Sequence, residues 1–313
     1  MRPLCLVPTL LGAALLASPA AAVEPASCAK VSFSDVGWTD ITATTALTTT
    51  VLDAIGYQTD VRVLGLPFTF SGLATGEVDV FLGLWMPTMT TEITPYEAAG
   101  SIDTVAVNLI GAKYTLATNE VGAALGIRDF ADLAAHQEVL QGKIYGIEPG
   151  NDGNRTLLGM VAEDQFGTGT FEIVESSEQG MLAQVARATR QDKPIVFLGW
   201  EPHPMNANFA LTYLTGGDDL FGPDLGGAEV RTITRHGLVE DCPNLGRFLT
   251  NLTFSLEMEN EVMSAILDDG QAPGVAARDW MTRHPDLVAA WLDGVTTRSG
   301  GDAVAALQAA LAN

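Results

Sequence analysis

The chain of 313 residues is 47% hydrophobic and 17% charged, which excludes intrinsic disorder and is enough for two modest α/β domains or one large one. Its 16 Lys and Arg residues against 38 Asp and Glu residues give a formal net charge of -22. Because the sequence has no cluster of basic residues to neutralise phosphates, nucleic acid is a poor partner.

Residues 1–22 have the pattern of a secretory signal peptide. A basic start at Arg2 is followed by a short apolar core and by small residues that end at Ala22. The apolar run is short and is broken by Pro8 and Pro19, so it does not suit a membrane span. We expect cleavage after Ala22 and export of the mature chain.

Export changes the interpretation of the cysteines. Cys5 leaves with the signal peptide, so Cys28 and Cys242 remain. In an oxidising compartment two remaining cysteines favour one disulfide. The alternative is a reactive thiol, but no CxxC motif or adjacent histidine activates either residue.

Short strand-like runs alternate with helical patterns along the chain. The first strand is expected at residues 30–36, and in the helix after it Leu47, Val51, Leu52 and Ile55 share one face. Further strands are expected at residues 57–64, 78–82, 143–147, 171–174 and 195–198. This alternation indicates a parallel sheet covered by helices.

Two segments are interpreted as crossings between lobes, one at residues 108–119 and a return at residues 208–217. The predicted fold class is therefore α/β, with two α/β domains joined by two crossings and a ligand cleft between them. Lobe I is discontinuous, with residues 23–115 and 217–313, and lobe II has residues 116–216.

Three tryptophans follow strand-like runs and are candidates for a binding site. Residues 80–89 and 196–205 each contain an apolar strand followed by Gly, Trp and Pro, which places Trp85 and Trp200 in matching positions. Trp38 stands two residues before Asp40 at a third strand end. Ligands of α/β sheets bind outside the carboxyl ends of strands, although single tryptophans there are often core residues. Trp280 and Trp291 on C-terminal helices are interpreted as packing residues.

Catalysis is the minority hypothesis. The sequence has no GxSxG, HExxH, GxxxxGK[ST] or strand-following GxGxxG motif. Four histidines are scattered without paired ligand spacing, at positions His136, His203, His236 and His284. We therefore assign no catalytic residue, no metal and no cofactor.

Six motifs carry a resemblance to a known family: "GWTD" (37–40), "LGLWMPTM" (82–89), "GAKYTLAT" (111–118), "GIEPGNDGN" (146–154), "FLGWEPHPMN" (197–206) and "HPDLVAAWL" (284–292). The chain resembles the periplasmic substrate-binding proteins of ABC importers for glycine betaine and choline, and within that group it is most similar to choline-binding proteins. The resemblance implies a two-lobed fold of type II that closes over its ligand in the periplasm. It also implies a monomer that is not an enzyme and that serves a membrane permease and its ATPase.

The resemblance further implies roles for single residues. Trp38, Trp85, Tyr114 and Trp200 are expected to form an aromatic box around a trimethylammonium group, Asp40 and Asn151 to contact the rest of the ligand, and Cys28 to be bonded to Cys242. Aromatic faces suit a quaternary ammonium, which has no N–H to donate. Three residues also have structural alternatives: Asp40 as a cap or first-turn acid, Tyr114 as a strand aromatic and Asn151 as a turn residue.

Three hypotheses about function follow. The first is a choline-binding protein, with choline and acetylcholine not ranked against each other. The second is a protein of the same fold that binds glycine betaine, against which Asp40 argues by repelling the ligand carboxylate. The third is a secreted enzyme that acts on choline compounds.

Overall fold

One mixed β-sheet extends through the computed structural model, which describes residues 24–312. The sheet has nine strands in the order β2-β1-β3-β9-β4-β7-β5-β6, with β8 paired to β4. The strands are β1 (Lys30–Asp35), β2 (Gln58–Val63), β3 (Val80–Met86), β4 (Ile102–Thr118), β5 (Lys143–Tyr145), β6 (Glu172–Val174), β7 (Val196–Glu201), β8 (Thr212–Tyr213) and β9 (Gly227–Arg235). The predicted signal peptide lies outside the described residues.

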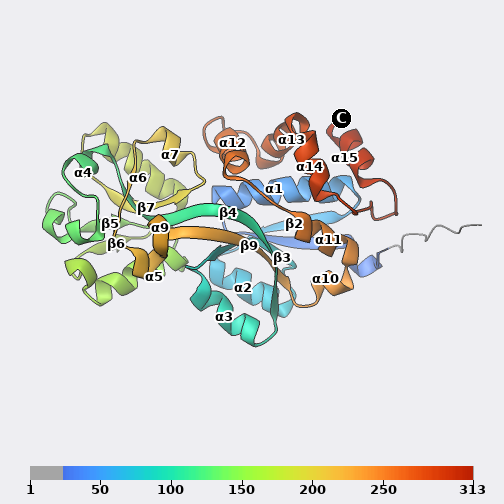
Figure 1. Cartoon of the computed structure of the whole chain (residues 1–313), viewed down its shortest axis with the longest axis horizontal. Helices are drawn as coiled ribbons and strands as arrows, with labels where there is room; N and C mark the ends of the chain where they lie inside the picture. Colours follow the sequence, from blue (N-terminus) through green and yellow to red (C-terminus); the bar gives the residue numbers. More distant parts are fainter. Residues whose placement is uncertain (1–23, 313) are drawn as a thin grey trace, which may run out of the picture.

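The molecule has two groups of elements with β4 and β9 running between them (Figure 1). We call them the β1–β3 half and the β5–β7 half. The first half carries α1 (Thr39–Ala54), α2 (Leu66–Thr75), α3 (Thr90–Ala98), α10 (Leu238–Asp241), α11 (Pro243–Asn251), α12 (Leu256–Leu267), α13 (Pro273–Arg283), α14 (Pro285–Trp291) and α15 (Ala303–Leu311). The second half carries α4 (Glu120–Ala124), α5 (Asp152–Ala162), α6 (Glu178–Arg190) and α7 (Met205–Asn208), and α8 (Asp218–Phe221) and α9 (Pro223–Gly226) lead into β9.

All six strands expected from the sequence are present, as β1, β2, β3, β5, β6 and β7. The expectation of a parallel sheet is correct only within each half, where β1 pairs parallel with β2 and β3, and β5 with β6 and β7. At the junction β9 is antiparallel to both β3 and β4, and β4 is antiparallel to β7. The two long strands that join the halves therefore make the sheet mixed.

The outward crossing expected at residues 108–119 lies almost entirely in β4. The return differs from the expectation, because the segment at residues 208–217 contains only the short strand β8, which pairs with the end of β4. The strand that runs back along β4 is β9, which begins ten residues after that segment, at Gly227. The lobe limits at residues 115/116 and 216/217 stay predictions.

Helix α1 is rich in threonine and is nevertheless buried. The hydroxyls of Thr44, Thr48 and Thr49 donate to the carbonyl oxygens of the residues four positions earlier, at 3.0, 2.8 and 2.8 Å. Because these bonds satisfy the hydroxyls inside the helix, α1 packs between the sheet and helices α12 and α13. This packing fixes the first turn of α1, which carries Asp40.

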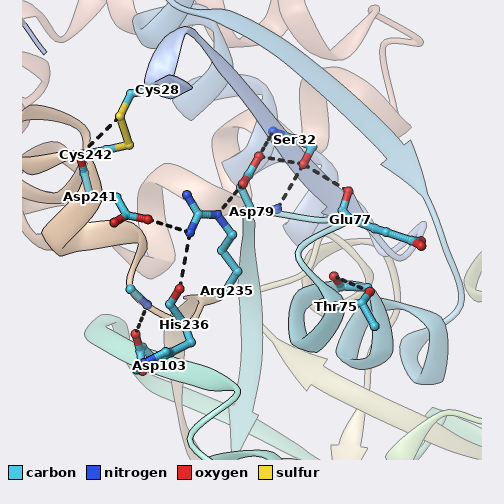
Figure 2. A network of polar contacts seen from close by, with 12 residues as sticks. Cys28, Ser32, Thr75, Glu77, Asp79, Asp103, Arg235, His236, Asp241 and Cys242 are labelled. Carbon is cyan, nitrogen blue, oxygen red and sulfur yellow. Dashed lines mark hydrogen bonds and ion pairs between the residues drawn. A yellow bond between two sulfur atoms is a disulfide. The ribbon is translucent and has the colours of Figure 1, made fainter. Parts of the chain in front are cut away.

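A disulfide joins Cys28 to Cys242, as predicted, with the two Cα atoms 5.7 Å apart. Figure 2 shows the polar network beside it, in which Arg235 donates to Asp79 at 2.9 Å and to Asp241 at 3.1 Å. These contacts tie the end of β9 to the start of β3 and to α10. They therefore stabilise the end of β3 opposite to the end that carries Trp85.

Candidate functional site

A small cavity lies between the two halves, with room for the centre of a water-sized sphere in about 20 Å³. The residues that line it are Trp38, Asp40, Trp85, Tyr114, Ile147, Asn151, Asp152 and Trp200. The structure thus brings together all six residues that the sequence analysis selected as ligand contacts, and their contact with a ligand stays a prediction.

The aromatic walls are set by neighbouring strands. Trp85 is near the end of β3, and Tyr114 on β4 is paired with Trp200 on β7. The ring centroids of Trp85 and Tyr114 are 6.0 Å apart, and those of Tyr114 and Trp200 are 6.3 Å apart at an interplanar angle of 83°. Trp38 precedes α1 and adds a fourth ring. Each of the four side chains is at most 6% exposed, so their faces are shielded from bulk water.

Asp40 brings a carboxylate into this aromatic cavity. The side chain is 2% exposed, and its Oδ2 accepts a hydrogen bond from Trp85 Nε1 at 3.2 Å. Its Oδ1 has no hydrogen-bond partner among the described residues. Trp38, not Asp40, is at the N-cap position of α1, so the cap alternative is wrong and the first-turn alternative is correct. A first-turn acid here also faces the cavity.

Asn151 is both a helix cap and a cavity residue. Its Oδ1 accepts from the backbone N–H of Asn154 at 3.0 Å and from Tyr114 Oη at 3.1 Å, and its Nδ2 donates to Asp152 Oδ1 at 3.0 Å. A Cβ at Gly153 would collide with the Tyr114 ring, so glycine allows the hydroxyl of Tyr114 to reach the start of α5. Asn151 therefore caps α5 and keeps one amide hydrogen for another acceptor, and its contact with a ligand stays a prediction.

The site is strongly acidic and poor in solvent. Burial raises the pKa of Asp40 to about 8, and the nearby Glu178 carboxylate adds to this shift. Burial also raises the pKa of Asp152 to about 6 and that of Glu148 to about 7. Among the described residues that line the cavity, none is basic. The arrangement favours a bound cation, because a positive charge in the cavity stabilises the ionised form of these carboxyl groups.

Sequence reasoning missed three residues that support the cavity. Trp38 Nε1 donates to Glu148 Oε1 at 2.8 Å, across the two halves. Glu178 accepts from the backbone N–H of Thr39 at 2.8 Å, and His203 Nε2 lies 3.2 Å from Glu178 Oε1. His203 lies within a motif that was singled out. Nothing local marks Glu178, because its partner Thr39 is 139 positions away in the chain.

The two C-terminal tryptophans are core residues, as predicted. The rings of Trp280 and Trp291 stack with centroids 6.4 Å apart and an interplanar angle of 15°. Trp291 Nε1 donates to the carbonyl oxygen of Thr253 at 3.0 Å, and neither tryptophan lines the aromatic cavity.

The described residues contain neither a metal-binding cluster nor a membrane-spanning helix. Within residues 24–312, no group of three or more His, Cys, Asp and Glu side chains is arranged to hold a metal ion. Over the same described part of the chain, every helix is too short or too polar to cross a membrane.

A mixed sheet that joins two α/β halves, with an aromatic cavity between them, defines a two-lobed substrate-binding protein of type II. The chain belongs to the family described as the substrate binding domain of ABC-type glycine betaine transport systems, which it matches over residues 29–283. The family and the fold class predicted from the sequence are thus confirmed. Substrate-binding proteins of ABC importers act outside the cytoplasm.

Two solved structures are 61% identical to this chain, and each covers 92% of it and 100% of its own chain. One is an ABC-transporter choline binding protein in complex with choline, with a TM-score of 0.91. The other is an ABC-transporter choline binding protein in an unliganded semi-closed conformation, with a TM-score of 0.85. The present structure is therefore more similar to the choline complex than to the semi-closed form.

A more distant relative is the glycine betaine/carnitine transport binding protein GbuC of Listeria monocytogenes. It is 31% identical over 159 residues, which cover 51% of this chain and 52% of GbuC. The matched part thus spans about half of that relative, and the identity is lower than to the choline-binding structures.

Proposed function

We propose that this protein binds choline outside the cytoplasm and delivers it to the permease and ATPase of an ABC importer. The observation that supports this most directly is the cavity itself, in which four aromatic rings surround a buried carboxylate with one unpaired oxygen. Trp38, Trp85, Tyr114, Trp200, Asp40 and Asn151 are the proposed ligand contacts.

The chemistry of a quaternary ammonium matches this arrangement. Its charge is distributed over methyl groups and it has no N–H donor, so hydrogen bonds cannot hold it. The negative faces of aromatic rings attract such a cation, each by about 0.5–2 kcal/mol when water is excluded. Asp40 supplies the counter-charge at short range. A cage of this kind selects both the shape and the charge of the ligand.

The opposite end of choline is a hydroxyl, which needs polar partners. Asn151 has one amide hydrogen left after its bond to Asp152, and Asp152 Oδ2 accepts no hydrogen bond from the described residues. The Asn151 amide can donate to the choline hydroxyl, and Asp152 Oδ2 can accept from it, so together they suit a group that both accepts and donates.

Glycine betaine carries the same trimethylammonium group but ends in a carboxylate. Asp40 and Asp152 both line the cavity, and both would repel that carboxylate at short range. Betaine is therefore expected to bind more weakly than choline. We propose no catalytic role, because the family consists of substrate-binding proteins of transporters.

The same proposal covers the context of the protein. We infer a periplasmic monomer, released from a signal peptide at residues 1–22, with lobe I at residues 23–115 and 217–313 and lobe II at residues 116–216. The family membership and the disulfide between Cys28 and Cys242 support export to an oxidising compartment.

Calorimetric titration of the purified mature protein with choline, acetylcholine and glycine betaine tests the function. Choline has seven non-hydrogen atoms, so a ceiling of about 1.5 kcal/mol per atom limits the free energy of binding to about 10 kcal/mol, or a Kd of tens of nanomolar. We expect a Kd between that limit and the low micromolar range for choline. Weaker choline than betaine binding would contradict the proposal, and release of product from acetylcholine would indicate an enzyme.

A further inference from the structure

Glu178 is a buried carboxylate that connects the two halves without lining the cavity. The residue is 1% exposed and starts α6 in the β5–β7 half. Its Oε2 accepts from the backbone N–H of Thr39 at 2.8 Å, and its Oε1 accepts from Thr39 Oγ1 at 2.5 Å. Thr39 begins α1 in the β1–β3 half and is 3% exposed.

Thr39 is placed so that this contact fixes two cage residues. Its neighbours in the chain are Trp38 and Asp40, which both line the cavity. Because Glu178 holds Thr39 by a backbone and a side-chain bond at once, it sets the position and the orientation of this turn. The first wall of the cage and its counter-charge are therefore positioned from the opposite half of the molecule.

His203 extends the connection to another wall. Its Nδ1 accepts from the backbone N–H of Met205 at 2.9 Å, so that nitrogen carries no proton. The other ring nitrogen, Nε2, is then the donor to Glu178 Oε1 at 3.2 Å. The same ring packs edge-on against Trp200, with ring centroids 4.9 Å apart. Glu178 thus joins the Trp38–Asp40 turn to the Trp200 wall.

We propose that Glu178, Thr39 and His203 form an interlobe latch that holds the cage closed and sets the rate at which the ligand leaves. Glu178 is the positioning residue of this latch. The proposal rests on the proposed binding function. If the halves separate, the Thr39 bonds break and a buried carboxylate loses both of them, so opening of the occupied site is opposed most strongly here.

A second connection across the halves differs in its surroundings. Arg155 on α5 donates to Glu92 on α3, and the Arg155 side chain is 44% exposed. Exposed ion pairs contribute little, since water replaces them at small cost. The buried Glu178–Thr39 contact and the solvated Arg155–Glu92 ion pair can therefore be compared by experiment.

Glu178→Gln tests the latch with little change in volume. An amide has only one acceptor oxygen, so either the Thr39 N–H or the His203 Nε2–H is left facing an NH₂ group. Thr39→Val removes one hydroxyl bond and keeps the shape, and Thr39→Ser restores that bond. Glu257→Gln is the control for a first-turn acid, because Glu257 lies in the first turn of α12 but is exposed. Arg155→Gln is the control for the solvated connection.

The measurement is stopped-flow association and dissociation of choline, followed by tryptophan fluorescence. For Glu178→Gln we expect dissociation at least about tenfold faster with association within about twofold of wild type, since the contact forms after encounter. Thr39→Val is expected to accelerate dissociation about threefold, with recovery in Thr39→Ser. Glu257→Gln and Arg155→Gln are expected to keep the wild-type rates.

Two results would overturn the latch. One is a wild-type dissociation rate in Glu178→Gln at an unfolding midpoint that shows the variant is folded. The other is an equal acceleration in Arg155→Gln, which would mean that any contact across the halves has this effect. If Glu178→Gln does not fold, the Thr39→Val and Thr39→Ser pair decides alone. Failure of the wild type to bind choline would instead contradict the proposed function.

Discussion

Two groups of tryptophans in this protein are equally buried but have different surroundings. Trp85 and Trp200 are each 4% exposed, and Trp280 and Trp291 are each 2% exposed. The C-terminal pair stacks ring on ring, whereas the other two stand on either side of Tyr114 at a cavity that contains a carboxylate. The exposed fraction of a tryptophan therefore does not distinguish a binding site from a core. The groups that surround its ring do.

The largest expected effect is on stability and concerns the stacked pair. Trp291→Ala removes a large side chain from a packed region and is expected to lower the free energy of unfolding by about 3–5 kcal/mol. The affinity of the folded fraction for choline should stay near that of wild type. Urea unfolding and a titration of the same preparation measure the two quantities. A parallel loss of affinity would mean that the two groups of tryptophans are not distinct.

Asp40→Asn addresses the carboxylate that distinguishes the cavity from the core. Contacts to a charged group contribute about 1.5–3 kcal/mol, so choline should bind about tenfold to a hundredfold more weakly. Betaine should lose much less, because the substitution also removes a repulsion of its carboxylate. Titration of both ligands at one ionic strength gives the ratio. An unchanged ratio would assign Asp40 to the helix alone.

Opening one wall of the cage should have a similar or smaller effect. Trp85→Ala or Trp200→Ala is expected to weaken choline binding by about tenfold, or about 1.4 kcal/mol, because water enters and one aromatic face is lost. Trp85→Phe and Trp200→Phe serve as controls, since a smaller ring keeps most of the cation attraction. If the alanine and phenylalanine variants bind alike, an aromatic face at these positions does not hold the ligand.

A dependence on pH is expected to be about as large as the loss of one aromatic wall. The empty cavity holds Asp40 with a pKa of about 8, so the group is protonated at pH 6.5. A bound cation favours the ionised form, so binding below pH 8 releases a proton and the affinity should rise about tenfold from pH 6.5 to 8. Titrations in buffers of different ionisation enthalpy count the released protons. Asp40→Asn should flatten the profile, apart from a part due to Asp152 and Glu148.

The same pKa shift makes the stability of the unliganded protein change with pH in the opposite direction to the affinity. In the unfolded chain Asp40 ionises near a pKa of about 3.9, well below its value in the folded protein. The unfolded state therefore loses its proton first, and the unliganded protein should lose stability as the pH rises from about 4 towards 8. Saturating choline should reduce this loss. A stability that rises over this range in the wild type but not in Asp40→Asn would contradict the assignment.

Three of the four aromatic walls, together with Asp40 and Asn151, have a local signal in the sequence, whereas Tyr114 was expected only from the family resemblance. Trp85 and Trp200 follow matching apolar strands, Trp38 and Asp40 flank a helix start, and Asn151 stands in a turn. Glu148 and His203 lie within two of the quoted motifs and Glu178 lies in none. The sequence does not mark the roles of these three residues, since the roles depend on partners brought in from distant parts of the chain. Sequence patterns report the element that carries a residue but not what the tertiary fold places opposite it.

The fold shows the same limit. Periodicity and turn residues identified the strands of both halves, most clearly β3 and β7, which are buried apolar runs. The position of β9 between β3 and β4 was not predictable from these patterns, since the sequence of a strand carries no record of its partner or its direction. For this reason the return crossing was expected at residues 208–217, whereas the structure has it in β9.

The pairing of β9 with both β3 and β4 has a mechanical consequence. The halves are joined by a strip of hydrogen-bonded strands, not by two free linkers. The pairing of β4 with β9 shifts register three times, between Thr104 and Ala106, between Val107 and Leu109 and between Ile110 and Ala112. Such irregularities let a ribbon bend, while its cross-strand bonds resist shear and sliding. The β4–β9 junction can therefore bend in one direction and is stiff in the others. The two halves should return to the same relative alignment each time they open and close.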